Sequence, residues 1–235
     1  MKRIELLLAM VAVFTVSCST TAVKDVTAYA DLFIGTAAHG HVFPGATTPF
    51  GMVQLSPDNG TSGWDWCSGY NYSDTVIAGF SHTHLSGTGI GDLCDILFMP
   101  SLNPFNTSLP DTLASVAKQN RSTFSHNAEQ ARPGYYSVVL DNGVDVELTA
   151  TPRCGIQRYT ASSAGKMQVL VDLGYAVNWD RPVECSLAWR DNSLSGKRIS
   201  SGWASRQFQF FHSEFSKKPV TVKMIRNGQS SEGFE

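Results

Sequence analysis

Residues 136–149 read YSVVLDNGVDVELT, and they contain two runs in which apolar and polar side chains alternate. Such alternation is typical of a β-strand that buries one face. Asp141-Asn142-Gly143 lies between the two runs, and Asn-Gly in this position is a strong signal for a hairpin turn. We therefore predict an antiparallel hairpin, with one strand ending at Leu140 and the next beginning at Val144.

Short runs of the same character recur downstream, each bounded by turn residues. They cover Gly155–Tyr159, Met167–Leu173, Cys185–Trp189, Gln207–Phe211 and Val220–Ile225. No segment shows the 3.6-residue periodicity of a long amphipathic helix. Several short strands at this spacing, without helices between them, predict an all-β fold, an antiparallel β-sandwich.

The part of the chain before the hairpin has a different composition. Segment 37–100 is dense in Gly, His, Trp and Asp, and its hydrophobic periodicity is weak. Binding residues concentrate in loops carried on a rigid sheet, so we expect the functional residues in this segment. Segment 101–133 is polar, and we expect it to be irregular.

The overall composition excludes several classes of protein. The 235 residues are 42% hydrophobic and 16% charged, which is typical of a folded globular protein and not of a disordered chain or a coiled coil. Lys and Arg number 18 against 20 Asp and Glu. This balance lacks the positive field that binding to a phosphate backbone needs, so we do not expect a nucleic-acid partner.

The N-terminus carries an export signal. Lys2-Arg3 precedes the apolar run Leu6–Val16, which is too short to span a bilayer. The run ends in Val16-Ser17-Cys18, which resembles the lipobox of bacterial lipoproteins and predicts lipidation of Cys18. An ordinary secretory signal is the alternative, and both place the folded part outside the cytoplasm, in the periplasm, on the outer membrane or at the cell surface. The predicted division is a lipoprotein signal peptide over residues 1–17, a tether over 18–30 and a folded domain over 31–235.

Four further cysteines lie in the predicted folded part: Cys67, Cys94, Cys154 and Cys185. In an oxidising compartment an even number permits two disulfides, in three possible connectivities. The alternative is that some of them are free and buried, because cysteine packs well as a small hydrophobic side chain. The sequence does not choose between these alternatives.

Two His-x-His pairs, His39-Gly40-His41 and His82-Thr83-His84, are candidate ligands. On an extended chain, residues two apart project to the same face, and such a pair with a carboxylate can hold Zn²⁺ or Fe²⁺. A small metallohydrolase is therefore one hypothesis. Neutral imidazole can equally hydrogen-bond sugar hydroxyls or backbone carbonyls, because it offers one donor and one acceptor.

The segment Trp64–Tyr70 reads WDWCSGY and places two indoles and a phenol around a carboxylate. Sugar sites use this mixture, with flat apolar faces for the ring and acceptors for its hydroxyls, although aromatic side chains also fill ordinary cores. The glycine-rich segment Ser86–Asp92 lacks the spacing and the lysine of a nucleotide-binding loop. Its glycines permit a tight turn, with Asp92 and Asp95 available as hydrogen-bond acceptors.

Five blocks of sequence, in the same order, resemble the N-terminal part of glycoside hydrolase family 92. They are Asp31–Thr36, His39–Ala46, Pro49–Asp58, Trp64–Tyr70 and Gly79–Gly87. Members of this family are exo-acting, calcium-dependent, inverting α-mannosidases, abundant in gut Bacteroidetes that degrade N-glycans and yeast mannan. The resemblance implies the N-terminal β-sandwich of a two-domain glycosidase, whose partner domain is a C-terminal (α/α)₆ barrel.

The same resemblance implies the substrate and the site. The expected reaction is hydrolysis of terminal α-linked mannose, with α-1,2 as the expected linkage. The residues expected to line the substrate are Trp64, Asp65, Trp66, His82, His84 and Asp92. In the family, both catalytic carboxylates and most of the Ca²⁺ environment belong to the barrel, so we expect no catalytic residue in this chain.

Glu235 falls within or just after the predicted sandwich, so we expect a truncated product that has no mannosidase activity alone and exposes an apolar face. The alternative function is a lipid-anchored, non-catalytic β-sandwich that binds mannose-containing glycans.

Overall fold

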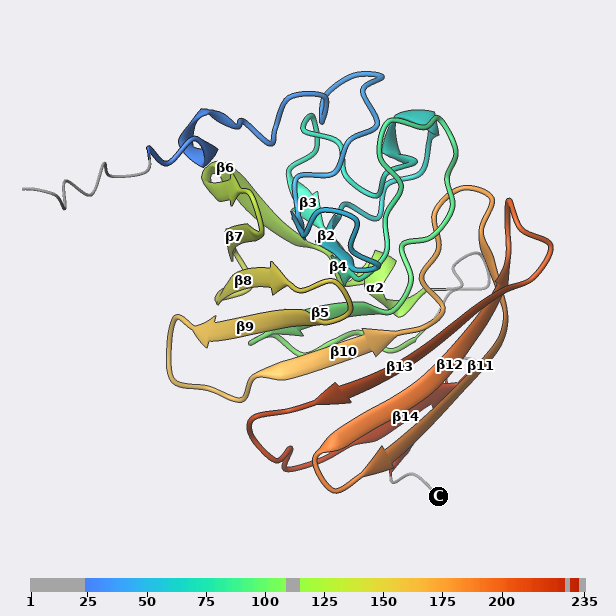
Figure 1. Cartoon of the computed structure of the whole chain (residues 1–235). Coiled ribbons are helices and arrows are strands. Elements are labelled where there is room, and N and C mark those ends of the chain that lie inside the picture. The colour runs from blue at the N-terminus through green and yellow to red at the C-terminus, as the bar shows by residue number, and fades with distance from the viewer. Residues whose placement is uncertain (1–23, 109–114, 227–228, 233–235) are drawn as a thin grey trace, which may run out of the picture.

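The structure is a computed structural model that describes residues 24–108, 115–226 and 229–232 (Figure 1). Strands dominate, and every described strand pair is antiparallel. In chain order the elements are η1 (Thr27–Tyr29), β1 (Ala46–Thr47), β2 (Gln54–Asp58), η2 (Trp64–Trp66), β3 (Val76–Ile77), β4 (Gly79–Ser81), β5 (Leu97–Ser101), α2 (Val116–Gln119), β6 (Ser122–Arg132), β7 (Tyr135–Leu140), β8 (Val144–Ala150), β9 (Gly155–Ala161), β10 (Gln168–Asp172), β11 (Arg181–Arg190), β12 (Ser193–Ser201), β13 (Gln207–Glu214), β14 (Lys223–Arg226) and β15 (Gln229–Glu232), where η marks a 3₁₀ turn. The all-β prediction is confirmed.

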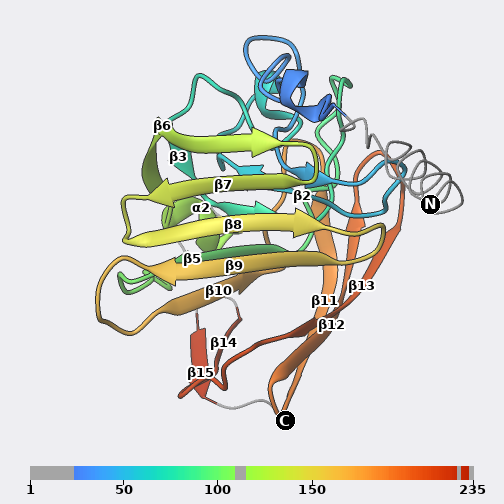
Figure 2. The same ribbon diagram turned by 60° about the vertical axis from the view of Figure 1, so that its left-hand side comes forward.

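Two five-stranded sheets form the sandwich. Their strand orders are β1-β2-β4-β5-β10 and β3-β6-β7-β8-β9. Figure 2 shows the second sheet in front, with β2 and β5 of the first sheet behind it. A single buried cluster fills the space between them, including Leu55, Phe80 and Met99 from the first sheet and Val138 and Leu148 from the second. The core therefore lies between two sheets that each bury one face.

The predicted hairpin is β7 and β8. Leu140 pairs with Val144 in the register, and the N–H of Gly143 donates to the carbonyl oxygen of Leu140 over 3.1 Å. Gly143 has φ +90°, a left-handed conformation that a side chain would disfavour. The inward residues of both strands are buried, as the alternation predicts.

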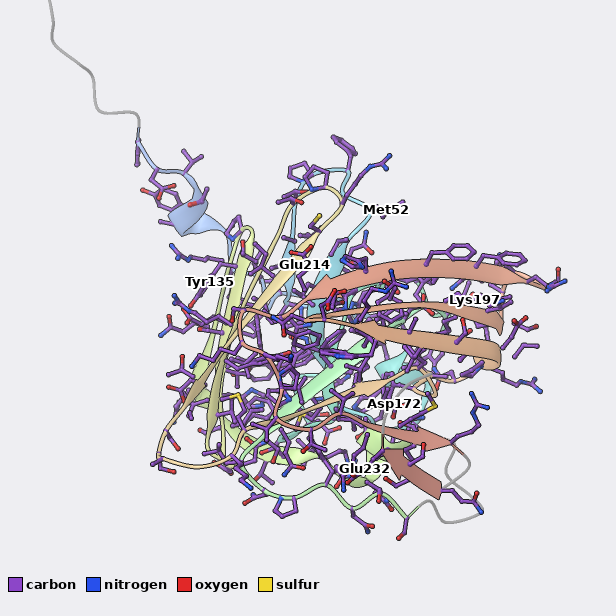
Figure 3. All side chains as sticks on the ribbon, turned by 90° about the horizontal axis from the view of Figure 1, so that it is seen from below. Met52, Tyr135, Asp172, Lys197, Glu214 and Glu232 are labelled. Carbon is purple, nitrogen blue, oxygen red and sulfur yellow. The ribbon has the colours of Figure 1, made fainter. Side chains whose placement is uncertain are left out.

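A third sheet, β11-β12-β13, covers the outer face of the first sheet. Phe98 of β5 points away from the main core and packs in a second cluster, against which Leu187 and Phe211 of the third sheet lie. Figure 3 shows the third sheet, with Lys197, extending away from the side of the molecule that carries Tyr135. The outward side chains of β13, Phe208 and Phe210, remain 51% and 72% exposed.

The expectation of an irregular segment 101–133 is wrong, because it contains α2 and the eleven-residue strand β6. A register shift between Phe124 and Glu129 interrupts the alternation of β6. Glu129 is also buried, where it accepts hydrogen bonds from the hydroxyls of Tyr70 and Tyr136. An inward carboxylate and a bulge together hide the strand pattern.

Two other sequence interpretations also change. The runs predicted from the sequence omit β12, whose many polar residues are held by pairing with β11 and β13 on its two sides. The four cysteines of the folded part are all free in the structure, so the disulfide alternative is wrong. Cys67 and Cys94 are buried, whereas Cys154 and Cys185 are exposed.

The predicted signal peptide and Cys18 lie outside the described residues. Of the predicted tether, residues 24–30 are described, and they are exposed. Among the residues that the structure describes, no helix has the length and apolar character needed to cross a membrane.

Candidate functional site

Long loops from segment 37–100 gather at one end of the sandwich, at the top of Figure 1. The loop Gly89–Asp92 is at their centre because it accepts hydrogen bonds from three tryptophans. The Gly89 carbonyl oxygen accepts from the indole Nε1 of Trp64 over 2.9 Å. The Gly91 carbonyl accepts from the backbone N–H of Trp179 over 3.3 Å, and Oδ2 of Asp92 accepts from the backbone N–H of Trp203 over 2.8 Å. Three segments distant in sequence are thereby joined at one loop.

The three indoles are accessible to a ligand. Trp64, Trp179 and Trp203 are 54%, 55% and 71% exposed. The turn before Trp179 is also fixed to the loop before Trp64, because Asn178 donates from Nδ2 to the Gly63 carbonyl over 3.1 Å. We call Trp64, Trp179, Trp203 and the Gly89–Asp92 loop the tryptophan cluster.

A polar group lies directly beside Trp64. Nδ1 of His39 is 2.5 Å from Oδ1 of Asp65, and Nε2 of His41 is 3.9 Å from the same oxygen. The His41 ring meets the Trp64 indole edge-on, with 4.2 Å between ring centroids. His41 is buried and its Nε2 has no hydrogen-bond partner, whereas His39 and Asp65 are accessible. The site thus offers an indole beside an imidazole and a carboxylate.

Trp66 has a different environment from Trp64, although both belong to η2. Its Nε1 donates to Oδ2 of Asp74 over 2.9 Å, and the hydroxyl of Thr61 donates to the same oxygen over 2.5 Å. Because η2 is a 3₁₀ turn and not a strand, the two indoles do not simply alternate between inside and outside. Trp66 fixes the loop, and Trp64 faces solvent.

His82 and His84 are held by the fold. Nδ1 of His82 hydrogen-bonds the carbonyl of Ile96 over 2.8 Å, and Nδ1 of His84 hydrogen-bonds the carbonyl of Gln54 over 2.7 Å. Burial lowers the pKa of His82, which favours its neutral form. The second ring nitrogens also have partners within the fold, because Nε2 of His82 lies 3.3 Å from Nε2 of Gln157 and Nε2 of His84 lies 3.1 Å from the hydroxyl of Ser81.

Asp92 is buried, and both of its oxygens are engaged. Oδ1 accepts from the N–H of Leu93 over 2.8 Å, and Oδ2 accepts from Trp203. The structure therefore brings Trp64 and Asp65 together, and Asp92 supports the loop beside them. Trp66, His82 and His84 instead hydrogen-bond other segments of the loops. Sequence reasoning did not assign His39, Trp179 or Trp203 to the substrate lining. Turn residues lie beside all three and were the local signal for them: Gly40 follows His39, Asn178 precedes Trp179 and Gly202 precedes Trp203.

The two His-x-His pairs do not converge on a common ligand position. Within the described part of the chain, the one group of three potential metal-binding side chains is Asp58, His84 and Cys94. Ca²⁺ takes six to eight oxygen ligands, so a nitrogen, a sulfur and one carboxylate do not suit it. This group of side chains therefore does not match the calcium that the family resemblance implies, most of whose environment is expected in the barrel.

A family model described as the glycosyl hydrolase family 92 N-terminal domain matches residues 29–235. The chain belongs to glycosyl hydrolase family 92. This family 92 chain is 33% identical over 162 residues to an uncharacterized secreted glycosidase of Arthroderma benhamiae, a match that covers 63% of the chain and 20% of the fungal protein.

Solved structures of the family lead to the same assignment. A family 92 α-mannosidase from Bacteroides thetaiotaomicron superposes with a TM-score of 0.79 at 33% identity, over 87% of this chain and 28% of that enzyme. Its complex with mannoimidazole superposes with a TM-score of 0.74 at 34% identity, over 88% and 29% of the two chains. The family 92 chain therefore spans less than a third of the length of these relatives.

Proposed function

We propose that the tryptophan cluster, with His39 and Asp65, lines the mannose subsite of an exo-acting, calcium-dependent, inverting α-mannosidase. The substrate is terminal α-linked mannose, in α-1,2 linkage, of N-glycans or mannans. Membership of family 92 supports this proposal, as does the mannoimidazole complex of a Bacteroides thetaiotaomicron α-mannosidase that is 34% identical to this chain over the aligned part.

The observation that carries the proposal is the half-exposed Trp64 indole beside the His39–Asp65 pair. An indole face packs against the C–H face of a pyranose, and Asp65 and His39 can accept and donate hydrogen bonds to its hydroxyls. Trp179 and Trp203 extend the apolar surface. Trp66, His82, His84 and Asp92 act as supports that position these loops.

Hydrolysis with inversion needs a carboxylic acid and a carboxylate about 6.5–9.5 Å apart. In this chain Asp92 is buried with both oxygens engaged, and Asp65 is paired with His39. As the resemblance to family 92 implies, we propose that the general acid and general base belong to a C-terminal (α/α)₆ barrel, and that this domain also holds most of the Ca²⁺ ligands. When bound, calcium polarises sugar hydroxyls; the residues of this chain orient the ring and exclude water from its apolar face.

We also propose that the protein is exported and anchored through a lipid on Cys18. The support is the charged and apolar run before Val16-Ser17-Cys18, together with a fungal relative described as secreted. Metabolic labelling with a palmitate analogue tests the anchor. Label that persists in a Cys18→Ala variant would overturn it.

The substrate site is tested on the purified chain by calorimetric titration with α-1,2-mannobiose, with release of mannose followed in the same sample. Trp64→Ala should weaken binding about tenfold or more, because a stacked aromatic contributes on the order of 1–2 kcal/mol. Phe210→Ala is the matched control, since it removes another exposed aromatic, from the outer face of β13. No mannose should be released.

Equal affinity in Trp64→Ala would overturn the subsite, and release of mannose would overturn the assignment of both catalytic carboxylates to another domain. In the proposed enzyme this chain supplies only part of the subsite, so we expect weak binding, with a Kd of about 1 mM. A Kd of about 1 μM or tighter without turnover would favour the alternative function, a lipid-anchored module that binds mannosides without hydrolysing them.

A further inference from the structure

A second group of chemically reactive side chains lies buried in the sandwich, apart from the tryptophan cluster. It consists of Asp58 at the end of β2, His84 just after β4 and Cys94 shortly before β5. The three are 0%, 4% and 0% exposed. Each offers one ligand atom, and these atoms all lie within 4.8 Å of one another.

The hydrogen bonding of His84 leaves one ring nitrogen for a ligand. Nδ1 is 2.7 Å from the carbonyl oxygen of Gln54, which can only accept, so Nδ1 carries the proton. Neutral imidazole then presents a lone pair at Nε2, which lies 3.1 Å from the hydroxyl of Ser81 and 3.4 Å from Oδ1 of Asp58. Histidines that bind metals typically donate their other N–H to a backbone carbonyl in this way.

Asp58 contributes an oxygen that no donor satisfies. Oδ2 accepts from the N–H of Ser81 over 3.0 Å, but Oδ1 is buried and has no hydrogen-bond partner. Oδ1 is 3.4 Å from Nε2 of His84, beyond the usual range of an N–H···O hydrogen bond. Oδ1 and Nε2 therefore lie close together with no hydrogen bond between them, and a cation bound to both would satisfy the carboxylate oxygen.

The space at these donor atoms is kept open by a glycine. A Cβ on Gly69, which has φ +85°, would clash with Oδ1 of Asp58 and come within 3.1 Å of Sγ of Cys94. The hydroxyl of Ser81 lies 3.1 Å from Nε2 of His84, so a second oxygen is close to the group. Carboxylate, imidazole, thiol and hydroxyl thus surround one buried position.

We propose that Asp58, His84 and Cys94 bind a zinc ion. Zinc prefers four ligands of the N, S and O types at about 2.0–2.3 Å, and tetrahedral geometry places such ligands roughly 3.3–3.7 Å apart. The 3.4 Å between Oδ1 and Nε2 agrees with this spacing. The hydroxyl of Ser81 is the nearest candidate for the fourth ligand.

The position of the group indicates a structural role. All three ligands are buried, so the ion would have no access to a substrate, and it would join the end of β2 to the segment that runs from β4 to β5. That segment includes the Gly89–Asp92 loop. The zinc proposal does not depend on the proposed mannosidase function, because it uses none of the exposed residues of the tryptophan cluster.

Metal analysis of the full chain tests the proposal. After expression with added zinc and dialysis against metal-free buffer, the chain should retain about one zinc per molecule, and Cys94→Ser or His84→Asn should lose most of it. Cys67→Ser is the matched control, because Cys67 is equally buried but lies outside the group. Replacement of zinc by Co²⁺ should add a thiolate-to-cobalt charge-transfer band that is absent from Cys94→Ser.

Zinc content near zero in the folded wild-type chain would overturn the proposal, as would equal zinc in Cys94→Ser. If the substituted chains do not fold, the melting temperature of the wild-type chain is the test. After a chelator has removed bound metal, added Zn²⁺ should raise that temperature. A melting temperature indifferent to zinc would also overturn it.

Discussion

The backbone N–H of Trp203 donates a 2.8 Å hydrogen bond to Oδ2 of Asp92, a residue 111 positions earlier in the chain. This bond joins the turn between β12 and β13 to the loop that also holds Trp64 and Trp179. A loop from the sandwich and a turn from the third sheet therefore form one surface.

Replacement of Asp92 by Ala should loosen this connection. It leaves the part-buried N–H groups of Leu93 and Trp203 without their carboxylate acceptor, and a hydrogen bond to a charged group contributes about 1.5–3 kcal/mol. Hydrogen exchange should show faster exchange of the Trp203 amide, together with a lower melting temperature. An unchanged exchange rate at Trp203 would contradict the structural role of Asp92.

Arg198 is the strongest single point of attachment between the third sheet and the sandwich. It is fully buried on β12, pairs with both Asp95 and Asp180, and donates to the carbonyl oxygens of Leu173 and Tyr175. Burial raises the pKa of Asp95, and the nearby guanidinium partly opposes this shift. Arg198→Met should lower the free energy of unfolding by about 3–5 kcal/mol, because it leaves two buried carboxylates unpaired.

The neighbouring residue provides a matched control for Arg198. Lys197 forms an ion pair with Glu184 at the surface, so Lys197→Met should change the free energy of unfolding by no more than about 1 kcal/mol. Urea unfolding of both variants measures the difference. Similar losses of unfolding free energy in the two variants would argue against Arg198 as the buried attachment of the third sheet.

Stability should fall with decreasing pH through the titration of His82. Burial lowers the pKa of His82 in the folded state, and this outweighs the opposing effects of the hydrogen bond to the Ile96 carbonyl and of Asp58. The unfolded chain therefore takes up a proton as the pH falls through about 6.5, and the folded chain does not. Unfolding is favoured progressively below that pH.

Replacement of His82 by Asn should reduce this pH dependence, because the Asn amide can still donate to the Ile96 carbonyl but does not titrate. The melting temperature between pH 7.5 and 5.5 is the measurement. His212→Asn, at an exposed histidine of β13, should leave the wild-type slope unchanged. A steeper slope in His82→Asn would refute the assignment.

The free cysteines should differ in reactivity. Cys154 is exposed, whereas burial raises the pKa of Cys67 and, more strongly, that of Cys94. Only thiolates react readily, so iodoacetamide should label Cys154 first and leave Cys67 and Cys94 unlabelled until the chain unfolds. Mass spectrometry of peptides from native and denatured samples measures the order. Rapid labelling of Cys94 in the native state would contradict it.

Local sequence was sufficient to predict seven of the fifteen described strands, all of them after residue 134. In β7 and β8 the alternation of apolar residues and the Asn142-Gly143 turn act over neighbouring positions, so they are readable without the rest of the fold. The same local pattern is absent from β6, where the buried Glu129 is satisfied by hydroxyls from Tyr70 and Tyr136. The polar strand β12 depends on Arg198 and its distant partners.

The sequence by itself determined the fold class, the hairpin and, through its ordered motifs, the family. Only the tertiary structure decided which residues of a motif face the solvent and which hold the loops in place. Trp64 and Trp66 are two positions apart in one motif, yet one indole faces solvent beside His39 and the other is bonded to Asp74. The physical reason is that strand patterns arise from neighbouring residues, whereas a site is made by loops whose hydrogen bonds join residues more than a hundred positions apart.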